Sequence, residues 1–383
     1  MKKMIFINQE SGPLMVDIVN KFARSDLNVI LYTGKIIETY SKLNSNVKVR
    51  YLSTYKKYND YIRIFTWTLF FLQTFFFLIV DLRKSSKLYF SSNPPFIHFL
   101  MVFFKNKFFI HVYDVYPDAL LAFPQINQSS YIYKLFIFFN KLFFIRAEKI
   151  FTPSESMKNM LEKYTDNKKI DVVSWWADTN FIKPIKKEEN LFINKFNLKD
   201  KFIVMYSGNL GSTHNLEKIL KAALSLVDEK EIIVIIIGDG AKKLIVNSFQ
   251  KQHNLKNLLI LPFQDVSMLP HSLTASDISI VLDSMSTKAD ISTASIPSKV
   301  YYLMAAGSVI YAEADKKSEL NRLINKYDLG LCDDSLDIQN LKTFILYCLK
   351  NPEKAKEFRD NSRKASLNFT SNNTNFLYET ICK

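Results

Sequence analysis

Ile296-Pro-Ser-Lys-Val-Tyr-Tyr-Leu-Met-Ala-Ala-Gly307 predicts a loop that enters a short helix. Pro297 breaks the preceding segment, residues 298–306 form the helix, and Gly307 ends it. An apolar strand is expected next, over residues 308–312. The stretch therefore predicts a helix and a strand in succession, the repeating pair of an α/β fold.

The start of this helix offers a site for an anion. The first turn of a helix presents unpaired backbone N–H groups and a positive dipole end, and the Ser298 hydroxyl and the Lys299 ammonium belong to that turn. Such an arrangement suits a phosphate. The same two residues are also compatible with a serine N-cap and a surface lysine, so the rest of the chain has to distinguish the two interpretations.

Apolar strands alternate with helical segments in both halves of the chain. A charged, irregular segment around residues 183–198 indicates a linker between the halves. Alternating strands and helices favour parallel sheets, so we expect two α/β domains with a cleft between them. Their expected bounds are 1–183 and 184–365, with a C-terminal helix over 366–383 that packs back on the first domain. The expected strands cover residues 4–8, 28–33, 47–52, 87–90, 108–112, 149–153, 171–174, 202–206, 231–237, 257–261 and 278–282.

Charge is distributed unevenly along the 383 residues, whose net charge is +14. Residues 1–180 hold 24 Lys and Arg against 14 Asp and Glu, and residues 181–383 hold 27 against 23. A basic first half favours an anionic membrane surface, whereas no finger, basic zipper or arginine-rich arm indicates nucleic-acid binding. The three cysteines have no paired spacing, which argues against disulfides and a zinc site and fits a reducing cytosol.

Two apolar stretches in the first half are long enough to span a membrane or to lie on its surface. Residues 64–80 contain no charged residue, and residues 131–145 interleave phenylalanines with Lys134 and Lys141. The first is compatible with a transmembrane helix, a buried crossover helix or a helix with one face on a membrane. The second is compatible with a core helix or with a helix at the boundary of headgroups and acyl chains.

Two residues of the first half lie where α/β sheets bind ligands. Gly12 stands in the turn after the first expected strand, where a glycine permits close approach of a ligand to the backbone. Asp114 follows the strand over residues 108–112, at the carboxyl end where open sheets form their sites. Each is also compatible with an ordinary turn residue.

Seven short motifs are spread along nearly the whole chain. They are Ser92-Asn-Pro-Pro95, Asp114-Val-Tyr-Pro-Asp118, Tyr206-Ser-Gly-Asn-Leu-Gly211, Ile236-Ile-Gly-Asp-Gly240, Ala275-Ser-Asp-Ile278, Ile296-Pro-Ser-Lys-Val300 and Met304-Ala-Ala-Gly307. Each motif is weak by itself, but with their order and spacing the chain resembles the GT-B glycosyltransferases, specifically the retaining family 4 class that builds bacterial cell-surface polysaccharides such as capsule and O-antigen.

This resemblance implies two Rossmann-like domains facing a central cleft and transfer of a hexosyl or N-acetylhexosaminyl group with retention and without a metal ion. The donor would be a nucleotide-sugar, UDP-linked in preference to GDP-linked, with no further cofactor. Asp114 and Lys299 would be catalytic. Donor contacts would come from Gly12, Gly208, Asn209, Gly211, His214, Gly238, Asp239, Ser298, Lys299 and Glu319.

Several positions depart from the pattern of many family members. Asn209 and His214 stand where an arginine and a lysine are common, and His214 is equally compatible with a phosphate contact and with a helix-start residue. Ala294 and Tyr302 replace two glutamates. Glu319 is a candidate replacement contact or a solvated helix carboxylate.

The expected enzyme is cytoplasmic and peripherally attached to the inner face of the membrane, with a polyprenyl-diphosphate-linked saccharide as acceptor. Two alternatives stay open. One is a nucleotide-sugar epimerase of the same fold, and the other is an inactive sugar-nucleotide-binding partner of a polysaccharide assembly complex, motivated by the absent glutamates.

Overall fold

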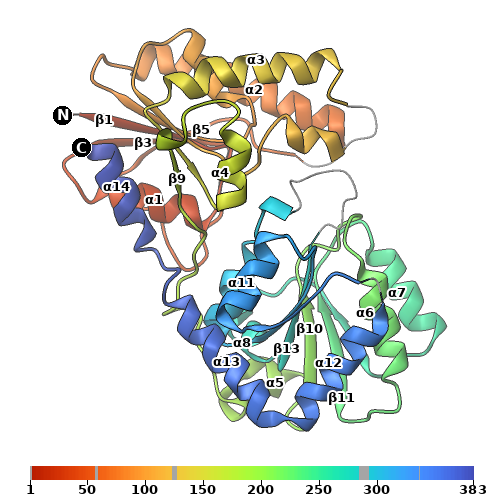
Figure 1. Ribbon diagram of the computed structural model, residues 1–383. Coiled ribbons are helices and arrows are strands. Elements are labelled where there is room, and N and C mark those ends of the chain that lie inside the picture. The colour runs from red at the N-terminus through yellow and green to blue at the C-terminus, as the bar shows by residue number, and fades with distance from the viewer. Residues whose placement is uncertain (1, 57–58, 123–126, 284–292, 336) are drawn as a thin grey trace. The chain divides into compact units, whose positions relative to one another are not determined.

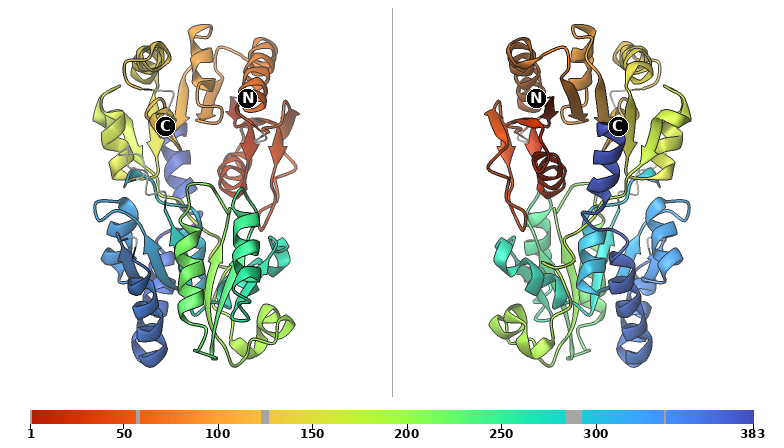
Figure 2. Two further views of the ribbon diagram at one scale, coloured as in Figure 1. Left: turned by 90° about the vertical axis from the view of Figure 1, so that its right-hand side faces the viewer. Right: turned by 90° about the vertical axis from the view of Figure 1, so that its left-hand side faces the viewer.

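The computed structural model describes residues 2–56, 59–122, 127–283, 293–335 and 337–383 (Figure 1). The chain forms two compact units, one of Met1–Trp175 with Ser371–Lys383 and the other of Trp176–Thr370. Each unit contains a parallel sheet with helices packed on it, as Figures 1 and 2 show. The prediction of two α/β domains is confirmed.

The sheet of the first unit has seven parallel strands in the order β5-β3-β1-β6-β7-β8-β9. The order reverses between β1 and β6, which is the arrangement of a doubly wound sheet. In register, Ile5 of β1 pairs with Ile30 of β3 and Leu88 of β6. A separate small sheet joins β2 (Glu10–Ser11) to β4 (Lys35–Ile36). The seven strands are β1 (Lys3–Ile7), β3 (Asn28–Thr33), β5 (Lys48–Tyr51), β6 (Lys87–Ser91), β7 (Phe108–His111), β8 (Lys149–Thr152) and β9 (Ile170–Val172).

The helices of this unit connect the strands. They are α1 (Pro13–Ala23), α2 (Asp60–Asp81), α3 (Tyr131–Arg146) and α4 (Glu155–Leu161), with 3-10 turns η1 (Ile97–Val102), η2 (Asp118–Ala122) and η3 (Asn167–Lys169). The last helix of the chain, α14 (Asn373–Cys382), packs on α1, where the rings of Phe22 and Tyr378 lie 5.1 Å apart. Lys87 also donates to the Ile381 carbonyl at 2.5 Å. The end of the chain thus belongs to the first unit.

The second unit has six parallel strands in the order β12-β11-β10-β13-β14-β15, with the reversal between β10 and β13. The strands are β10 (Phe202–Ser207), β11 (Ile232–Ile237), β12 (Leu258–Leu261), β13 (Ile278–Leu282), β14 (Val309–Glu313) and β15 (Gly330–Asp333). The helices are α5 (Leu191–Lys195), α6 (Leu216–Ser225), α7 (Lys243–Gln252), α8 (Leu269–Thr274), α10 (Lys299–Ala306), α11 (Glu319–Tyr327), α12 (Ile338–Lys350) and α13 (Pro352–Ser366), with 3-10 turns η4 (Lys187–Glu189) and η5 (Val266–Met268).

The segment around residues 183–198 is not a linker. It forms η4 and α5, and Phe192, Ile193 and Leu198 are buried in the core of the second unit with Ile203 and Met205 of β10. Its many charged residues suggested an exposed connection, but the three apolar side chains spaced along it anchor it to the sheet. Charge on the outer face of a helix does not prevent its inner face from packing.

The bounds of the predicted strands agree with the structure to within two residues, and those of β3 and β13 are as predicted. Strands β2, β4 and β15 were not predicted. Gly307 ends α10 in the left-handed region, with φ 69° and ψ 41°. Ser308 N donates to the Leu303 carbonyl at 3.1 Å across this turn, a pattern typical of a glycine that ends a helix. The predicted end of the helix is therefore confirmed.

Helix α2 contains the apolar residues 64–80, for which the sequence allowed a transmembrane helix, a buried crossover helix or a helix with one face on a membrane. It is the crossover between β5 and β6, and Thr66, Phe70, Thr74 and Leu78 form a buried stripe on one side of it. By length and composition it also qualifies as a membrane span, but 28% of its most apolar window is buried within the protein. One face covers the sheet, and much of the remaining surface is exposed.

Candidate functional site

Lys299, the first residue of α10, is half-buried in the second unit. Its Nζ lies 4.4 Å from the centre of the Tyr206 ring, and a Cβ added at Gly208 would lie 3.6 Å from that Nζ. Burial lowers the pKa of Lys299 to about 8, and the charge of Asp283 opposes the shift. The structure therefore brings Lys299 to the loop after β10, at the reversal of strand order, and the surface-lysine interpretation is wrong.

The backbone at the start of α10 differs from expectation. Ser298 occupies the N-cap position of α10, but it has helical angles and makes no side-chain cap hydrogen bond, so its hydroxyl does not cap the helix. Its side chain is exposed. Val300 N and Tyr301 N already donate to Pro297 O at 3.0 Å and Ser298 O at 3.2 Å. These two N–H groups are therefore paired, contrary to the expectation from the sequence. An anion at this helix start would be held mainly by the Lys299 ammonium and the helix dipole.

The loop after β10 interlocks with the loop after β11. Leu210 N donates to Asp239 O at 2.8 Å, and Lys242 N donates to Leu210 O at 3.0 Å. Gly238 has φ 156°, and a Cβ there would lie 1.9 Å from the Gly208 carbonyl oxygen. Only glycine allows the two backbones to come this close. The Gly208–Gly211 and Gly238–Gly240 segments therefore form one packed edge at the carboxyl ends of β10 and β11.

His214 closes the first of these loops. Its Nδ1 lies 2.9 Å from Tyr206 Oη and 3.0 Å from the Asn209 carbonyl oxygen, which also accepts from the Tyr206 hydroxyl at 2.7 Å. Since a carbonyl only accepts, the proton is assigned to Nδ1, which leaves Nε2 to contact a ligand. Burial lowers the pKa of His214, and the charges of Lys299 and Lys242 lower it further. His214 thus orders the loop and donates from Nε2 only when protonated.

The other candidates of this unit have different environments. Asn209 is exposed, and its Nδ2 would lie 3.1 Å from a Cβ added at Gly211. Asp239 is exposed and pairs with Lys243 at 2.8 Å. Glu319 begins α11 and pairs with Arg322 at 3.2 Å, with 12% of its side chain exposed. It is therefore largely covered, unlike the solvated carboxylate that the sequence also allowed.

A buried ionic cluster at the carboxyl ends of β14 and β15 was not predicted. Lys218 of α6 is 2% exposed and pairs with Glu313 at 3.2 Å and Asp333 at 2.7 Å. Asn215 donates to Glu313 Oε1 at 3.1 Å, and Tyr311 donates to Asp333 at 2.5 Å. A signal existed in the sequence, because Glu313 ends an otherwise apolar strand, but its partner is far away along the chain. The cluster joins α6 to the two strands.

The pKa values of Glu313 and Asp333 are shifted in opposite directions. Burial raises the pKa of Glu313 against the influence of Lys218 and Asn215. Burial also opposes ionisation of Asp333, but hydrogen bonds from Lys218, Tyr311 and Asn340 outweigh it and hold the pKa of that carboxyl well below its usual range. Within the described ranges, no group of three or more His, Cys, Asp or Glu side chains is placed to hold a metal ion.

Asp114 follows β7 in the first unit. Ser92 Oγ accepts hydrogen bonds from Tyr113 N at 2.9 Å and Asp114 N at 3.5 Å, which fixes the turn. Asp114 keeps contact with solvent, but desolvation by the surrounding protein raises the pKa of its carboxyl group. Beside it the rings of Tyr113 and Trp175 lie 4.8 Å apart, both half-buried. The aromatic pair was not recognised in the sequence, because Trp175 follows another strand.

Two other residues of the same unit have different environments. His111, the last residue of β7, is buried, and Tyr89 Oη lies 2.7 Å from its Nδ1. Gly12 is the N-cap of α1, and a Cβ added there would meet no atom of the described residues within 4 Å. Among those residues the backbone at Gly12 is therefore open to a ligand, and none of their contacts requires a glycine.

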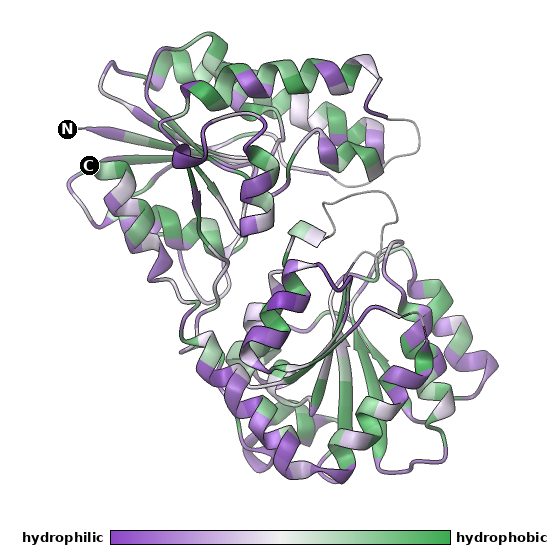
Figure 3. Cartoon of the chain, in the orientation of Figure 1, coloured by the Kyte–Doolittle hydropathy of each residue, from purple (hydrophilic) through white to green (hydrophobic). Residues whose placement is uncertain are grey.

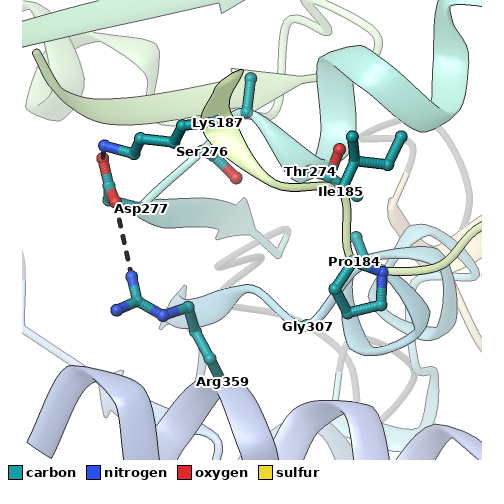
Figure 4. Close-up of a pocket in the computed structure, with 10 residues that line it drawn as sticks. Pro184, Ile185, Lys187, Thr274, Ser276, Asp277, Gly307 and Arg359 are labelled. Atoms are coloured by element: carbon teal, nitrogen blue, oxygen red, sulfur yellow. Dashed lines mark hydrogen bonds and ion pairs between the residues drawn. The ribbon is translucent and has the colours of Figure 1, made fainter. Parts of the chain in front are cut away.

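A cavity lies at the amino ends of the strands of the second unit (Figure 4). It has a volume of about 400 Å³ and is lined in part by Asp277, Gly307 and Pro184. Asp277 pairs with Lys187 at 3.1 Å and with Arg359 at 3.4 Å, so the charges in the cavity satisfy one another. The cavity lies at the Gly307 end of α10, whereas Lys299 is at the other end.

Comparison with known proteins finds a family that matches most of the second unit and two relatives of the chain. Residues 186–365 match the family described as "Glycosyl transferases group 1". The "Probable glycosyltransferase WbjE" of Pseudomonas aeruginosa is 27% identical over 232 residues, 58% of this chain and 55% of that protein. The "Putative colanic acid biosynthesis glycosyl transferase WcaI" of Escherichia coli K12 is 26% identical over 250 residues, 64% of this chain and 60% of that protein. The matches thus span less than two thirds of either relative.

Solved structures resemble the whole chain. Anabaena Alr3699/HepE, crystallised with UDP, superposes with a TM-score of 0.73 at 13% identity over 100% of both chains. WaaG, a glycosyltransferase involved in lipopolysaccharide biosynthesis, superposes with a TM-score of 0.72 at 11% identity, over 98% of this chain and 99% of its own. At such low identity the likeness concerns the fold alone. This chain has the GT-B fold, with two Rossmann-like units.

Proposed function

We propose that this chain is a retaining glycosyltransferase that moves a sugar from a nucleotide-diphosphate sugar to a saccharide acceptor during bacterial surface polysaccharide synthesis. One observation carries the proposal. The Lys299 ammonium lies beside the glycine loop after β10, within a unit that matches group 1 glycosyl transferases. The relatives WbjE and WcaI, the latter described as a colanic acid enzyme, support polysaccharide synthesis.

The second unit would bind the donor. When the bond between the anomeric carbon and the diphosphate breaks, negative charge grows on the departing phosphate, and a fixed cation stabilises that charge most effectively where water is scarce. Lys299 is such a cation, and the positive end of α10 adds to it. A UDP-sugar is favoured over a GDP-sugar, which agrees with the UDP held by HepE.

Around the diphosphate, the remaining donor contacts would come from the candidates already placed. The interlocked edge containing Gly208, Gly211 and Gly238 offers backbone, Asn209 and Ser298 offer exposed polar side chains, and Gly12 offers open backbone in the first unit. His214 would donate through Nε2 in its protonated form. Glu319 would replace the absent glutamates, and Asp239 would contact the nucleotide.

The first unit would bind the acceptor near Asp114. We infer a family 4 mechanism without a metal ion, in which the acceptor hydroxyl attacks the face that the diphosphate leaves and its proton passes to the departing phosphate or to Asp114. A raised carboxyl pKa makes Asp114 a better proton acceptor. The cavity that it lines measures only about 10 Å³, the size of one water, so a saccharide must approach Asp114 from its exposed side.

The acceptor would be a saccharide linked to polyprenyl diphosphate, as in the assembly of capsule or O-antigen. Such a lipid resides in a bilayer, so the enzyme would work in the cytoplasm at the inner face of the membrane. The basic first half of the chain supports this location.

Asp114→Asn is expected to lower the transfer rate by about 10²–10⁴-fold, because the amide keeps the shape but accepts no proton. Donor affinity should stay unchanged, since the proposed contacts to the diphosphate come from other residues, above all Lys299. The wild-type rate should rise with pH through the raised pKa of Asp114, and the variant should lose this rise. Steady-state kinetics across pH would measure both. Asp26→Asn, at an exposed turn residue, is the matched control. Full activity of the Asp114 variant would contradict the assignment.

The proposed reaction itself is tested by incubating the full chain with labelled UDP- and GDP-sugars, with and without a polyprenyl-diphosphate saccharide. Label should enter the lipid only when the acceptor is present. Release of an isomerised sugar nucleotide without acceptor would instead indicate an epimerase. Donor binding without turnover under either condition would indicate an inactive partner of an assembly complex.

A further inference from the structure

Helices α2 and α3 and the turn η1 form one continuous surface of the first unit, here called the α2–α3 face. Phe75 of α2 lies 5.0 Å from Phe103, the residue after η1, measured between ring centres. Phe99 of η1 lies 5.2 Å from Phe139 of α3. Arg146 closes the other end by donating to Met101 O at 2.7 Å and Phe104 O at 3.0 Å. Figures 1 and 2 show α2 and α3 on the same side of this unit.

The α2–α3 face exposes large apolar side chains from all three elements. Phe103 is 62% exposed and Phe138 of α3 is 61% exposed. Figure 3 shows the hydrophobic character of both helices along most of their length. Apolar side chains this numerous on adjacent elements mark an interaction surface. The exposed large apolar residues of the face are Tyr61, Ile64, Phe65, Leu72, Phe76, Ile79, Val80, Val102, Phe103, Tyr131, Ile132, Leu135, Phe138, Leu142 and Ile145.

The opposite side of α2 is fixed to the sheet, which argues against a transmembrane helix. Gln9 Nε2 donates to Thr66 O at 3.0 Å, and Ser53 N donates to Gln73 Oε1 at 2.7 Å. At the end of the helix, Asp81 is buried and accepts hydrogen bonds from Tyr32 and Arg50. Inserting α2 across a bilayer would break these bonds and uncover the strands beneath.

The exposed charge on the face is mainly basic. Residues 61–80 and 131–146 contain Arg63, Lys134, Lys141 and Arg146 and no aspartate or glutamate. Of the two aspartates at the ends of α2, Asp60 pairs with Arg63 at 2.9 Å and Asp81 is buried. Lys134 and Lys141 are exposed on α3 among the apolar residues. Anionic headgroups complement such a surface, whereas a neutral apolar partner would leave the lysines without compensation.

We propose that the α2–α3 face docks on an anionic lipid bilayer, with α2 and α3 lying in the plane of the membrane. The apolar side chains enter the boundary between headgroups and acyl chains, and Lys134 and Lys141 contact the headgroups. The proposal rests on the proposed function in one respect, because a lipid-linked acceptor gives docking its purpose. Docking itself requires neither donor nor acceptor, so it can be measured separately from transfer.

The test is cosedimentation of the full chain with vesicles of phosphatidylcholine, alone or mixed equally with phosphatidylglycerol. The wild type should bind the anionic vesicles more tightly, and added salt should weaken this binding. Phe103→Ser with Phe138→Ser should lower the affinity by roughly tenfold for each residue. Lys134→Gln with Lys141→Gln should lower it by roughly fivefold for each residue and reduce the salt dependence.

The matched controls change exposed apolar residues and exposed lysines of the second unit. They are Leu244→Ser with Phe263→Ser, at 79% and 58% exposed side chains, and Lys251→Gln with Lys350→Gln. The controls should bind vesicles as the wild type does. Equal losses in controls and face variants, or unchanged binding of the face variants, would overturn the proposal. So would vesicle-bound protein that resists alkaline carbonate extraction, which would indicate a spanning helix. Normal docking with no sugar transfer would refute the proposed function alone.

Discussion

Lys299→Ala is expected to lower the rate of sugar transfer by about 10²–10³-fold and to weaken the binding of UDP. The wild-type ammonium lies beside the Gly208 loop, where it would face the phosphate that gains charge in the transition state. Alanine removes that charge and leaves α10 intact, since the buried face of the helix begins at Val300. Steady-state kinetics and calorimetric titration with UDP would measure the two effects.

The pH dependence provides a second test of Lys299. Its pKa of about 8 in the free protein means that the ammonium loses its proton as the pH rises through that value. Affinity for UDP should therefore fall above about pH 8 in the wild type, and this fall should be absent in Lys299→Ala. Lys251→Ala, at an exposed position of α7, should behave as the wild type. Undiminished UDP affinity in Lys299→Ala would refute the phosphate assignment.

Lys218→Met is expected to lower the free energy of unfolding by about 3–5 kcal/mol at neutral pH. The lysine is the cation between two buried carboxylates, Glu313 and Asp333, and methionine leaves both without a counter-charge. Urea denaturation would measure the loss. Lys221→Met, at an exposed position of the same helix, should change stability by no more than about 0.5 kcal/mol.

The sign of the pH effect follows from the two carboxyl groups. In the wild type the pKa of Asp333 is lower in the folded state than in the unfolded state, so its stabilising contribution is present above about pH 4 and is lost as the pH falls. Without Lys218 both carboxyl groups resist ionisation, so the deficit of Lys218→Met should grow as the pH rises from about 4 towards 7. Adding Glu313→Gln should recover part of the loss. A deficit independent of pH would contradict the ionic explanation.

Much of the fold was predictable because most strands of the two large sheets are short apolar runs bounded by polar residues or glycine. The strand over Ile278–Leu282 has no polar residue except Ser279, and β3 is similarly clear. Such runs lie in the middle of a parallel sheet, where both faces are covered. The linker prediction failed because Phe192 and Ile193 lie among charged residues, and composition alone does not reveal that they share a buried face.

The candidate donor site was only partly predictable. The sequence placed Lys299 at a helix start and Gly208 after a strand, and the reversal of strand order between β10 and β13 explains why they meet. The Lys218–Glu313 pair was missed because its members belong to α6 and β14, and nothing local links them. The unusual backbone at Ser298 was missed because a serine before a helix most often caps it.

The apolar stretches illustrate a further limit of sequence patterns. Residues 64–80 are apolar on every side of the helix, so periodicity alone does not show which side the sheet covers. The structure shows a narrow buried stripe through Phe70 and Leu78, with Phe76 and Ile79 exposed. The contribution of η1 to the same face, through Val102 and Phe103, was not foreseen at all.

The central claim is that Lys299 and the Gly208 loop hold the diphosphate of a nucleotide-sugar. A crystal structure of the full chain soaked with UDP, and in parallel with GDP, tests it most directly. We expect the diphosphate within hydrogen-bonding distance of Lys299 Nζ, between α10 and the Gly208–Gly211 segment. A nucleotide bound elsewhere in the chain, with Lys299 still resting on the Tyr206 ring and no phosphate beside it, would contradict the account.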